Sequence, residues 1–254
     1  MPRLLGRAKV TFGIRRSKKF LGNITIIADG FAAPITAGNF VDLSIRNFYT
    51  GLPVKIARKK VGSGNLFEVA TLPILGSFQE GFYDPLTAKL RRIPLEIVRL
   101  ERGNTQTPKL SYAEEDTGPT PRWDFSDTPS SVSDENGNSL LSFDIPGLVA
   151  LNHPDKNLNG GSAEFFCLQT GSLPEEKRKL LDGEYAPFGY IVEGFDVFLK
   201  LAAGDIIEST VVDDLGQLNL VKLRQSSFSE VVQSSEQNYG ENAKAAEEGN
   251  TTSN

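Results

Sequence analysis

Sulfur and imidazole side chains, which often act as nucleophiles, bases or metal ligands, are scarce in this chain. Its 254 residues include one cysteine, Cys167, and one histidine, His153. A lone cysteine excludes an internal disulfide bond, and a lone histidine leaves almost no material for a zinc site or a histidine-based triad. The enzyme classes that remain work without a Cys/His metal cluster, and we predict no metal and no cofactor. We interpret His153 as a turn residue without a special role and Cys167 as buried and inert.

Neither glycine motifs nor charge predicts a nucleotide or nucleic-acid ligand. The sequences GxGxxG and GxxxxGK[ST] do not occur where a strand meets a helix. Residues 1–60 carry 12 Lys/Arg against 2 Asp/Glu, although the whole chain has a net charge of -5. The basic runs at 15–19 and 58–60 contain no aromatic residues that could stack on bases. We expect a basic edge on an acidic domain. The four basic residues of the run 15–19 are expected to attract an acidic partner and to be dispensable for folding.

The apolar pattern predicts a protein made mainly of β-strands. The predicted strands cover residues 8–16, 22–29, 52–57, 66–71, 93–98, 146–151, 164–168, 186–192, 205–212 and 218–224. Two helices are predicted, at 34–48 with Pro34 in its first turn and at 195–203 ending before Gly204. Many short strands with two helices favour a closed antiparallel barrel of about eight strands, capped by the helices, over a parallel sheet.

The predicted barrel domain covers residues 8–225 and follows an extension of residues 1–7. The Ser-, Thr- and Pro-rich stretch 104–139 is interpreted as a surface insertion, with the lone Trp123 as its anchor on the domain. Residues 226–254 are predicted to be an acidic disordered tail. No apolar segment approaches the ~20 residues needed to cross a bilayer. The first residues lack the apolar run of a targeting peptide.

Three stretches resemble the cyclophilin-type peptidyl-prolyl isomerases. DGFAAPITAGNFVDLSIRNFYTG at 29–51 is similar to the family's first helix and its flanks. GLVALNHPDKNLNGGSAEFFCL at 147–168 resembles the central strand pair with its G-S-x-F-F signature, and LLDGEYAPFGYIVEGFDVFLKLAAGDII at 180–207 resembles the block L-D-G-x-x-x-x-F-G-x-V. AAPITAGNFVDL, IPLEI at 93–97 and Tyr185 are most similar to the divergent cyclophilins of the chloroplast thylakoid lumen. In that subgroup the cyclophilin domain follows an N-terminal helical domain.

The resemblance implies an eight-stranded cyclophilin-like barrel that rotates X–Pro bonds without a nucleophile, metal or cofactor. The uncatalysed barrier is about 18–20 kcal/mol. An apolar pocket holds the proline ring, and a positioned donor stabilises the twisted amide. By resemblance, Arg58 is the candidate donor and Tyr185 stands where active members carry His. The implied substrate-binding residues are Phe67, Ala150, Leu151, Asn152, Phe166, Leu180 and Leu181.

Several positions depart from the family pattern. Arg58 lies nine residues before Phe67, which is more than the family spacing, and Ala70 stands at the groove Gln. Loss of donors that act in the transition state lowers turnover more than binding. We therefore expect a prolyl isomerase domain of weak activity. The alternative is a catalytically inactive cyclophilin-like protein-binding module in photosystem assembly or repair.

The expected partners are proline-containing protein segments and photosynthetic membrane protein complexes, with no nucleic acid. By resemblance, the expected location is the thylakoid lumen, and the alternative is the cytoplasm.

Overall fold

The computed structural model describes the greater part of the chain. The described residues are 1–61, 65–72, 81–85, 87–100, 108–112, 141, 143, 145–154, 157–168, 181 and 184–222. The chain divides into two compact units, Met1–Val221 and Lys222–Asn254, and all described residues except Lys222 belong to the first. The predicted anchor Trp123, the groove residue Leu180 and the predicted tail 226–254 lie outside the described residues. Within the described part, no helix has the length and apolarity required to span a bilayer.

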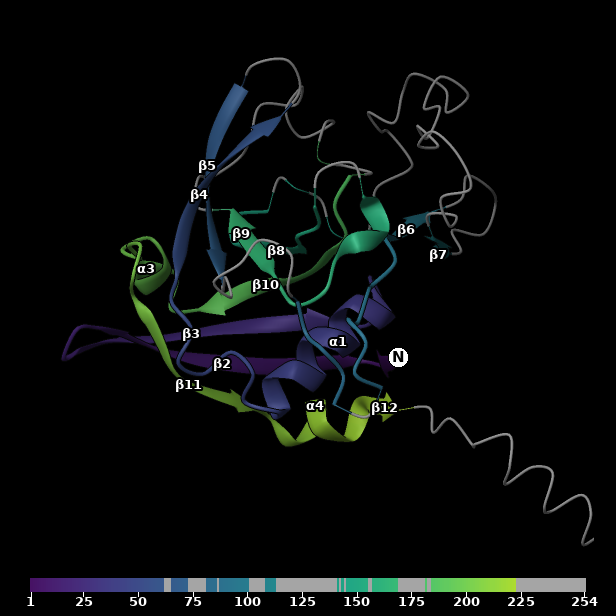
Figure 1. The fold of residues 1–254 in the computed structure, drawn as a ribbon, viewed down its shortest axis with the longest axis horizontal. Coiled ribbons are helices and arrows are strands. Elements are labelled where there is room, and N and C mark those ends of the chain that lie inside the picture. The colour runs from purple at the N-terminus through teal and green to yellow at the C-terminus, as the bar shows by residue number, and fades with distance from the viewer. Residues whose placement is uncertain are drawn as a thin grey trace, which may run out of the picture. The chain divides into compact units, whose positions relative to one another are not determined.

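The described strands make a mainly β fold around one curled antiparallel sheet (Figure 1). The sheet has eight strands in the order β11-β2-β3-β10-β8-β9-β5-β4. Their bounds are β2 Arg7–Arg16, β3 Lys19–Asp29, β4 Lys55–Val61, β5 Asn65–Leu72, β8 Leu148–Leu151, β9 Phe165–Leu168, β10 Pro187–Glu193 and β11 Ile206–Val212. All seven pairs of neighbouring strands in this sheet are antiparallel. The predicted strand pattern is therefore largely confirmed.

The two edge strands of this sheet approach each other where β4 begins. The Gly51 N–H donates to the Ile207 carbonyl at 2.7 Å, and the Ile207 N–H donates to the Leu52 carbonyl at 3.0 Å. One step further on, the Val54 N–H donates to the Asp205 carbonyl at 2.6 Å. The segment leading into β4 is therefore hydrogen-bonded to the start of β11.

The described helices differ from the predicted ones in length. Helix α1 covers Pro34–Ile45 and ends before the predicted limit at residue 48. Asn47 adopts a left-handed conformation with φ 55°, and the Phe48 N–H donates to the Leu43 carbonyl at 3.0 Å. This bond pattern is a Schellman termination, which stops the helix.

Helix α3 covers only Phe195–Phe198 of the predicted 195–203. An additional helix, α4 Asp214–Asn219, and a 3₁₀ turn, η1 Leu158–Gly160, were not predicted. The side chain of Asp213 caps α4 by accepting the Gly216 N–H at 2.9 Å.

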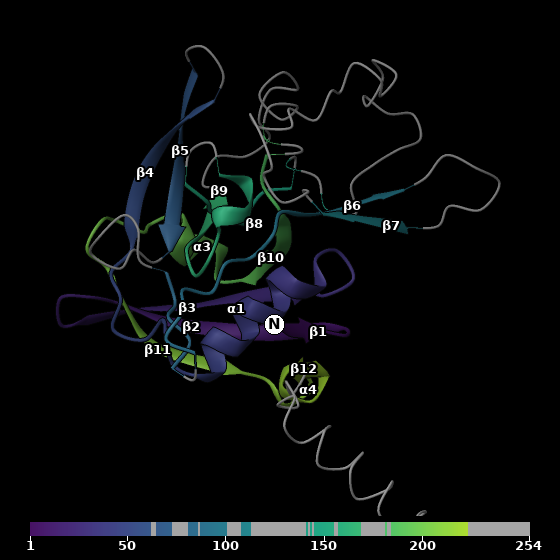
Figure 2. The same ribbon diagram turned by 45° about the vertical axis from the view of Figure 1, so that its right-hand side comes forward.

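Two small sheets each contain one strand, β1 (Pro2–Leu4) or β7 (Pro108–Tyr112), that the sequence did not predict. Strand β1, Pro2–Leu4, pairs with β12, Leu220–Lys222. Leu4 is fully buried, and Gly38 of α1 allows the close approach, because a Cβ there would lie 2.7 Å from the Arg3 Cα. Strand β6, Glu96–Leu100, pairs with β7, Pro108–Tyr112, as a separate hairpin (Figure 2). The first part of the predicted insertion 104–139 therefore contains a strand.

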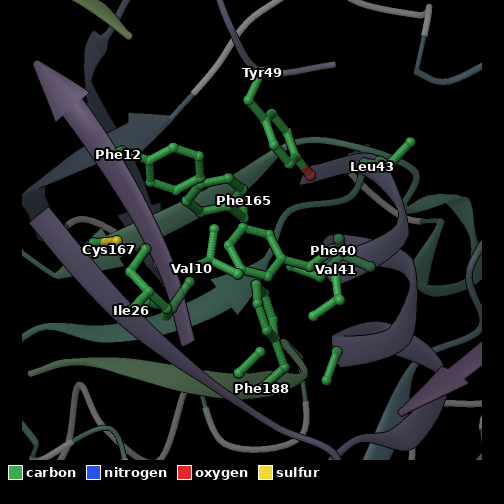
Figure 3. Close-up of a cluster of buried hydrophobic side chains, with 14 of the residues drawn as sticks. Val10, Phe12, Ile26, Phe40, Val41, Leu43, Tyr49, Phe165, Cys167 and Phe188 are labelled. Carbon is green, nitrogen blue, oxygen red and sulfur yellow. The ribbon is translucent and has the colours of Figure 1, made fainter. Parts of the chain in front are cut away.

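The main core is an aromatic cluster between α1 and the concave face of the sheet (Figure 3). The rings of Phe40 and Phe165 meet edge to face at 5.0 Å, and Phe12 meets Tyr49 edge to face at 5.9 Å. The Tyr49 hydroxyl donates to the Ala163 carbonyl at 3.1 Å, and burial raises its pKa. Cys167 is fully buried in the same cluster, and burial raises the pKa of its thiol.

A buried carboxylate from β6 replaces the missing N-cap of α1. The N-cap residue Ala33 has no side chain that could accept a hydrogen bond. Glu96, which is fully buried, accepts the Ile35 N–H at 3.0 Å, the Thr36 N–H at 2.8 Å and the Thr36 hydroxyl at 2.9 Å. A negative charge at a helix N-terminus is favourable because it meets unpaired N–H groups and the positive end of the dipole. Glu96 therefore fixes β6 against α1.

Three arginines of the basic N-terminal region 1–60 are paired with acidic residues from other strands or from the turn before β11. Arg7 meets Asp29 at 2.9 Å, and Arg15 meets Glu208 at 3.2 Å. Arg16 donates to both carboxylate oxygens of Asp205, at 2.7 and 2.8 Å. The Asp205 side chain is only 2% exposed. Removal of Arg16 would leave a buried carboxylate without this partner, which argues against the prediction that the basic residues of the run 15–19 are dispensable for folding.

We predict that Glu96→Gln destabilises the fold. The substitution keeps the shape of the side chain but removes the charge that meets the N-terminus of α1. The free energy of unfolding, measured by urea denaturation, should fall by about 1–3 kcal/mol. Glu208→Gln is the matched control, because it removes only a partly exposed ion pair and should cost less than about 1 kcal/mol. Equal losses in the two variants would contradict the capping role.

The Arg16–Asp205 pair predicts a loss of stability in acid. The hydrogen bond from Arg16 holds the pKa of Asp205 below its ordinary value. The stabilisation is therefore complete above the unfolded-state pKa of about 3.9 and is lost as the pH falls through the lower folded-state pKa. Asp205→Asn should lower the urea midpoint at neutral pH, and its deficit relative to wild type should shrink between about pH 5 and pH 2. A deficit that stays constant over this range would refute the linkage.

Candidate functional site

The strand pair β8–β9 separates the main core from a second apolar cluster on the other face of the sheet. Successive residues of a strand point to opposite faces. Phe165 and its partner Leu151 pack in the main core, whereas Phe166 and its partner Ala150 pack in the second cluster. We call this second group the outer cluster. Its buried members are Ala32, Leu141, Phe143, Leu148, Ala150, Phe166, Leu181 and Tyr185.

The outer cluster contains four of the residues that the resemblance assigned to the groove. Ala150, Phe166 and Leu181 are fully buried, and Tyr185 is 8% exposed. These residues come from β8, β9 and the turn that leads into β10. Leu151, which was also assigned to the groove, lies instead in the main core and is 6% exposed.

Three aromatic rings form a continuous series from the outer cluster toward solvent. The Tyr185 ring meets Phe166 edge to face with centroids 5.1 Å apart. The His153 ring stacks on Tyr185, with centroids 4.6 Å apart and planes only 19° from parallel. His153 therefore packs against a candidate site residue, although the sequence predicted no special role for it. Its position directly after the predicted groove residue Asn152 was the signal available in the sequence.

Main-chain hydrogen bonds hold the loop that carries Asn152 and His153. The Leu151 N–H donates to the Ala186 carbonyl at 3.1 Å, and the Asn152 N–H donates to the Glu164 carbonyl at 2.8 Å. These bonds join the end of β8 to the turn before β10 and to the residue before β9. The loop is thus fixed beside Tyr185.

The pairing of β4 with β5, and of β5 with β9, shows which face of the sheet each remaining candidate position belongs to. Thr71 pairs with Phe166 on β9 and with Lys55 on β4, so these three positions share one face. Phe67 pairs with Lys59 and has the same parity as Thr71. Phe67 therefore belongs to the face of the outer cluster.

Arg58 and Ala70 occupy positions that alternate with those of Lys55 and Thr71 along their strands, and so belong to the opposite face of the sheet. Ala70 of β5 pairs with Cys167 of the main core. Arg58 pairs with Glu68, which lies two residues before Ala70 on β5. The register thus gives Arg58 and Phe166 different faces, whereas it gives Lys55 and Phe166 the same face. Among the described residues, no group of three His, Cys, Asp or Glu side chains could hold a metal ion.

Comparison with known proteins agrees with the sequence motifs. The family model for cyclophilin type peptidyl-prolyl cis-trans isomerases matches residues 11–217. A putative thylakoid lumen peptidyl-prolyl cis-trans isomerase of Synechocystis sp. is 36% identical over 84% of this chain and 48% of its own length. The chloroplastic peptidyl-prolyl cis-trans isomerase CYP38 of Arabidopsis thaliana is 33% identical over 84% of this chain and 44% of its own length. The chain spans about half the length of these curated relatives.

A solved structure of a cyclophilin type isomerase from Cryptosporidium parvum aligns with 82% of this chain and 98% of its own, with 16% identity and a TM-score of 0.48. The family model covers most of the chain and includes β8, β9 and Tyr185. The resemblance stated from the motifs is thereby confirmed, and the chain belongs to the cyclophilin-type peptidyl-prolyl cis-trans isomerase family.

Proposed function

We propose that this domain catalyses cis–trans isomerisation of X–Pro bonds in protein segments, at a rate below that of ordinary family members. The observation that carries the proposal is the outer cluster, which brings Phe166, Tyr185, Ala150 and Leu181 together beside the loop of Asn152. An aromatic and aliphatic floor of this kind suits a proline ring, because the ring offers apolar surface and no N–H donor. Catalysis of this reaction needs no cofactor, since the domain only has to lower the barrier to rotation of the amide.

The proposed rate is low because two positions depart from the polar groups of the family pattern: Arg58 is at an unusual spacing from Phe67, and Ala70 replaces the groove Gln. A preformed donor must lie where the twisted amide gains charge, and loss of one such donor commonly costs about 10²–10³-fold in turnover. Arg58 remains the candidate donor by resemblance. Lys55 is a second candidate, since its position shares the row of Thr71 and Phe166.

A catalytically inactive binding module is the second candidate function. It is favoured by the full burial of Phe166, whose ring meets Tyr185 edge to face. A floor that is covered in the free protein binds a proline ring only after the cover moves. Such a domain could hold a proline-containing segment without turning it over quickly.

The closure of the barrel, the location of the protein and its partners are part of the same proposal. We infer that the curled sheet closes into an eight-stranded barrel over the domain 8–225, and the hydrogen bonds between residues 51–54 and 205–207 support closure. The names of the relatives support a thylakoid lumen location. Proline-containing segments of photosynthetic membrane complexes are the proposed partners, with the cytoplasm as the alternative location.

We predict that turnover of an Ala-Ala-Pro-Phe peptide is at least about 10²-fold below that of an ordinary cyclophilin. Phe166→Leu should remove the remaining activity, because it takes away the ring that meets Tyr185. Phe165→Leu is the matched control: it makes the same change at the next residue, but on the face of the main core. It should lower the free energy of unfolding while sparing activity per folded molecule. Activity lost equally in both variants would refute a site at the outer cluster.

The donor can be identified by comparing two alanine variants. We expect Lys55→Ala to lower kcat by about 10²-fold and Arg58→Ala to have little effect, because only Lys55 shares the face of Phe166. Lys89→Ala, at an exposed site on another segment, controls for the loss of positive charge. A loss confined to Arg58→Ala would instead support the assignment by resemblance. An isomerase rate that is absent in the wild type, with peptide binding retained, would favour the binding module.

A further inference from the structure

His153 is the outermost of three rings whose exposure rises in steps. Phe166 is fully buried, Tyr185 is 8% exposed and His153 is half-buried. The three rings come from different segments: β9, the turn before β10 and the loop after β8. Their packing therefore joins three parts of the chain around one point of the outer cluster.

Both nitrogens of the His153 ring lie close to main-chain carbonyl oxygens, and the neutral imidazole donates to one of them. Nδ1 lies 2.9 Å from the Pro154 carbonyl, and Nε2 lies 2.7 Å from the Glu184 carbonyl. Glu184 immediately precedes Tyr185, so the second contact links the imidazole to the backbone that carries the Tyr185 ring. The contact at Nε2 therefore ties the loop of His153 to the turn that carries Tyr185, and the two rings lie 19° from parallel.

The backbone of Tyr185 is anchored separately from its ring. Its N–H donates to the Leu181 carbonyl at 3.2 Å. The contacts of the Tyr185 ring include a nearly parallel one with His153 and a perpendicular one with Phe166. Both geometries suit the quadrupoles of aromatic rings.

We propose that His153 is a positioning residue that holds Tyr185 against Phe166 and thereby restricts access of a proline ring to the outer cluster. The inference rests on the proposed function, because it takes Phe166 as the floor of the prolyl site. Tyr185 acts as the cover, and the stacked imidazole keeps the cover closed. When a binding-competent state is only partly populated, the apparent affinity falls by that fraction. Release of the cover should thus strengthen binding.

The positioning role can be tested without substrate. The aromatic NMR signals of Tyr185 in the free protein report the stacked imidazole through its ring current. His153→Ala should shift these signals, whereas His153→Phe should largely restore them because it keeps a flat ring. Glu184→Ala is the control for the turn, because it removes the side chain but keeps the carbonyl that meets Nε2, and it should leave the signals in place. Tyr185 signals that are unchanged by His153→Ala would overturn the proposal.

The access role is tested with the Ala-Ala-Pro-Phe peptide. His153→Ala should bind it about two- to tenfold more tightly than the wild type, as expected for loss of one aromatic pair. His153→Phe should bind like the wild type. Weaker binding by His153→Ala would show that the stack forms the pocket rather than closes it, and would overturn the proposal.

The two proposals fail in different ways. Absence of peptide binding in both the wild type and His153→Ala would overturn the access role together with the proposed function, even where the Tyr185 signals shift. Binding that depends on Phe166 but does not change with His153 would overturn only the present inference.

Discussion

The alternation of side chains along β9 is the constraint on which both the core and the candidate site depend. Phe165 and Phe166 are adjacent, so the pleat of the strand sends one ring to each face. Phe165 meets Phe12 and Phe40 inside the sheet, and Phe166 meets Tyr185 on the other side. A register slip of one residue would exchange the two rings and place every partner on the wrong face. The site is therefore coupled to the packing of the core and cannot be rearranged independently of it.

Buried charges position α1 with respect to the strands that carry the site. Asp42 of α1 accepts Nη1 of Arg91 at 2.8 Å, and the Arg91 side chain is 8% exposed. Asn39, one helical turn earlier, donates to the Ser162 carbonyl at 2.6 Å, just before β9. Glu96 holds the N-terminus of the same helix. Directional bonds at three points fix the helix more narrowly than apolar packing alone, which tolerates small shifts. The acidic residues meet arginines inside the fold, so the uneven charge along the sequence does not imply an equally uneven surface.

The sequence predicted most strands and the start of α1, because these depend on local alternation and on Pro34. It did not predict the end of α1, which depends on the left-handed conformation of Asn47. The motifs identified Phe166 and Tyr185 as site residues, and the structure brings their rings together. The position of His153 after Asn152 placed it near the predicted groove, but its stacking on Tyr185 could not be deduced, because the two residues lie 32 positions apart. The faces of Arg58 and Lys55 likewise depend on pairing between β5 and β9, a non-local property that spacing along the chain does not determine.

The candidate site retains its apolar floor but differs in its polar groups, and these two parts contribute differently to catalysis. An apolar floor contacts the proline ring in much the same way before and during rotation, so it stabilises the ground state and the transition state alike. Only a donor aimed at the twisted amide distinguishes the two states. Ala70 stands at a position paired with Cys167 of the main core, and Tyr185 contacts two aromatic rings. Under the proposed function, recognition of proline is therefore separate from rapid turnover, because the apolar floor and the donor act on different states.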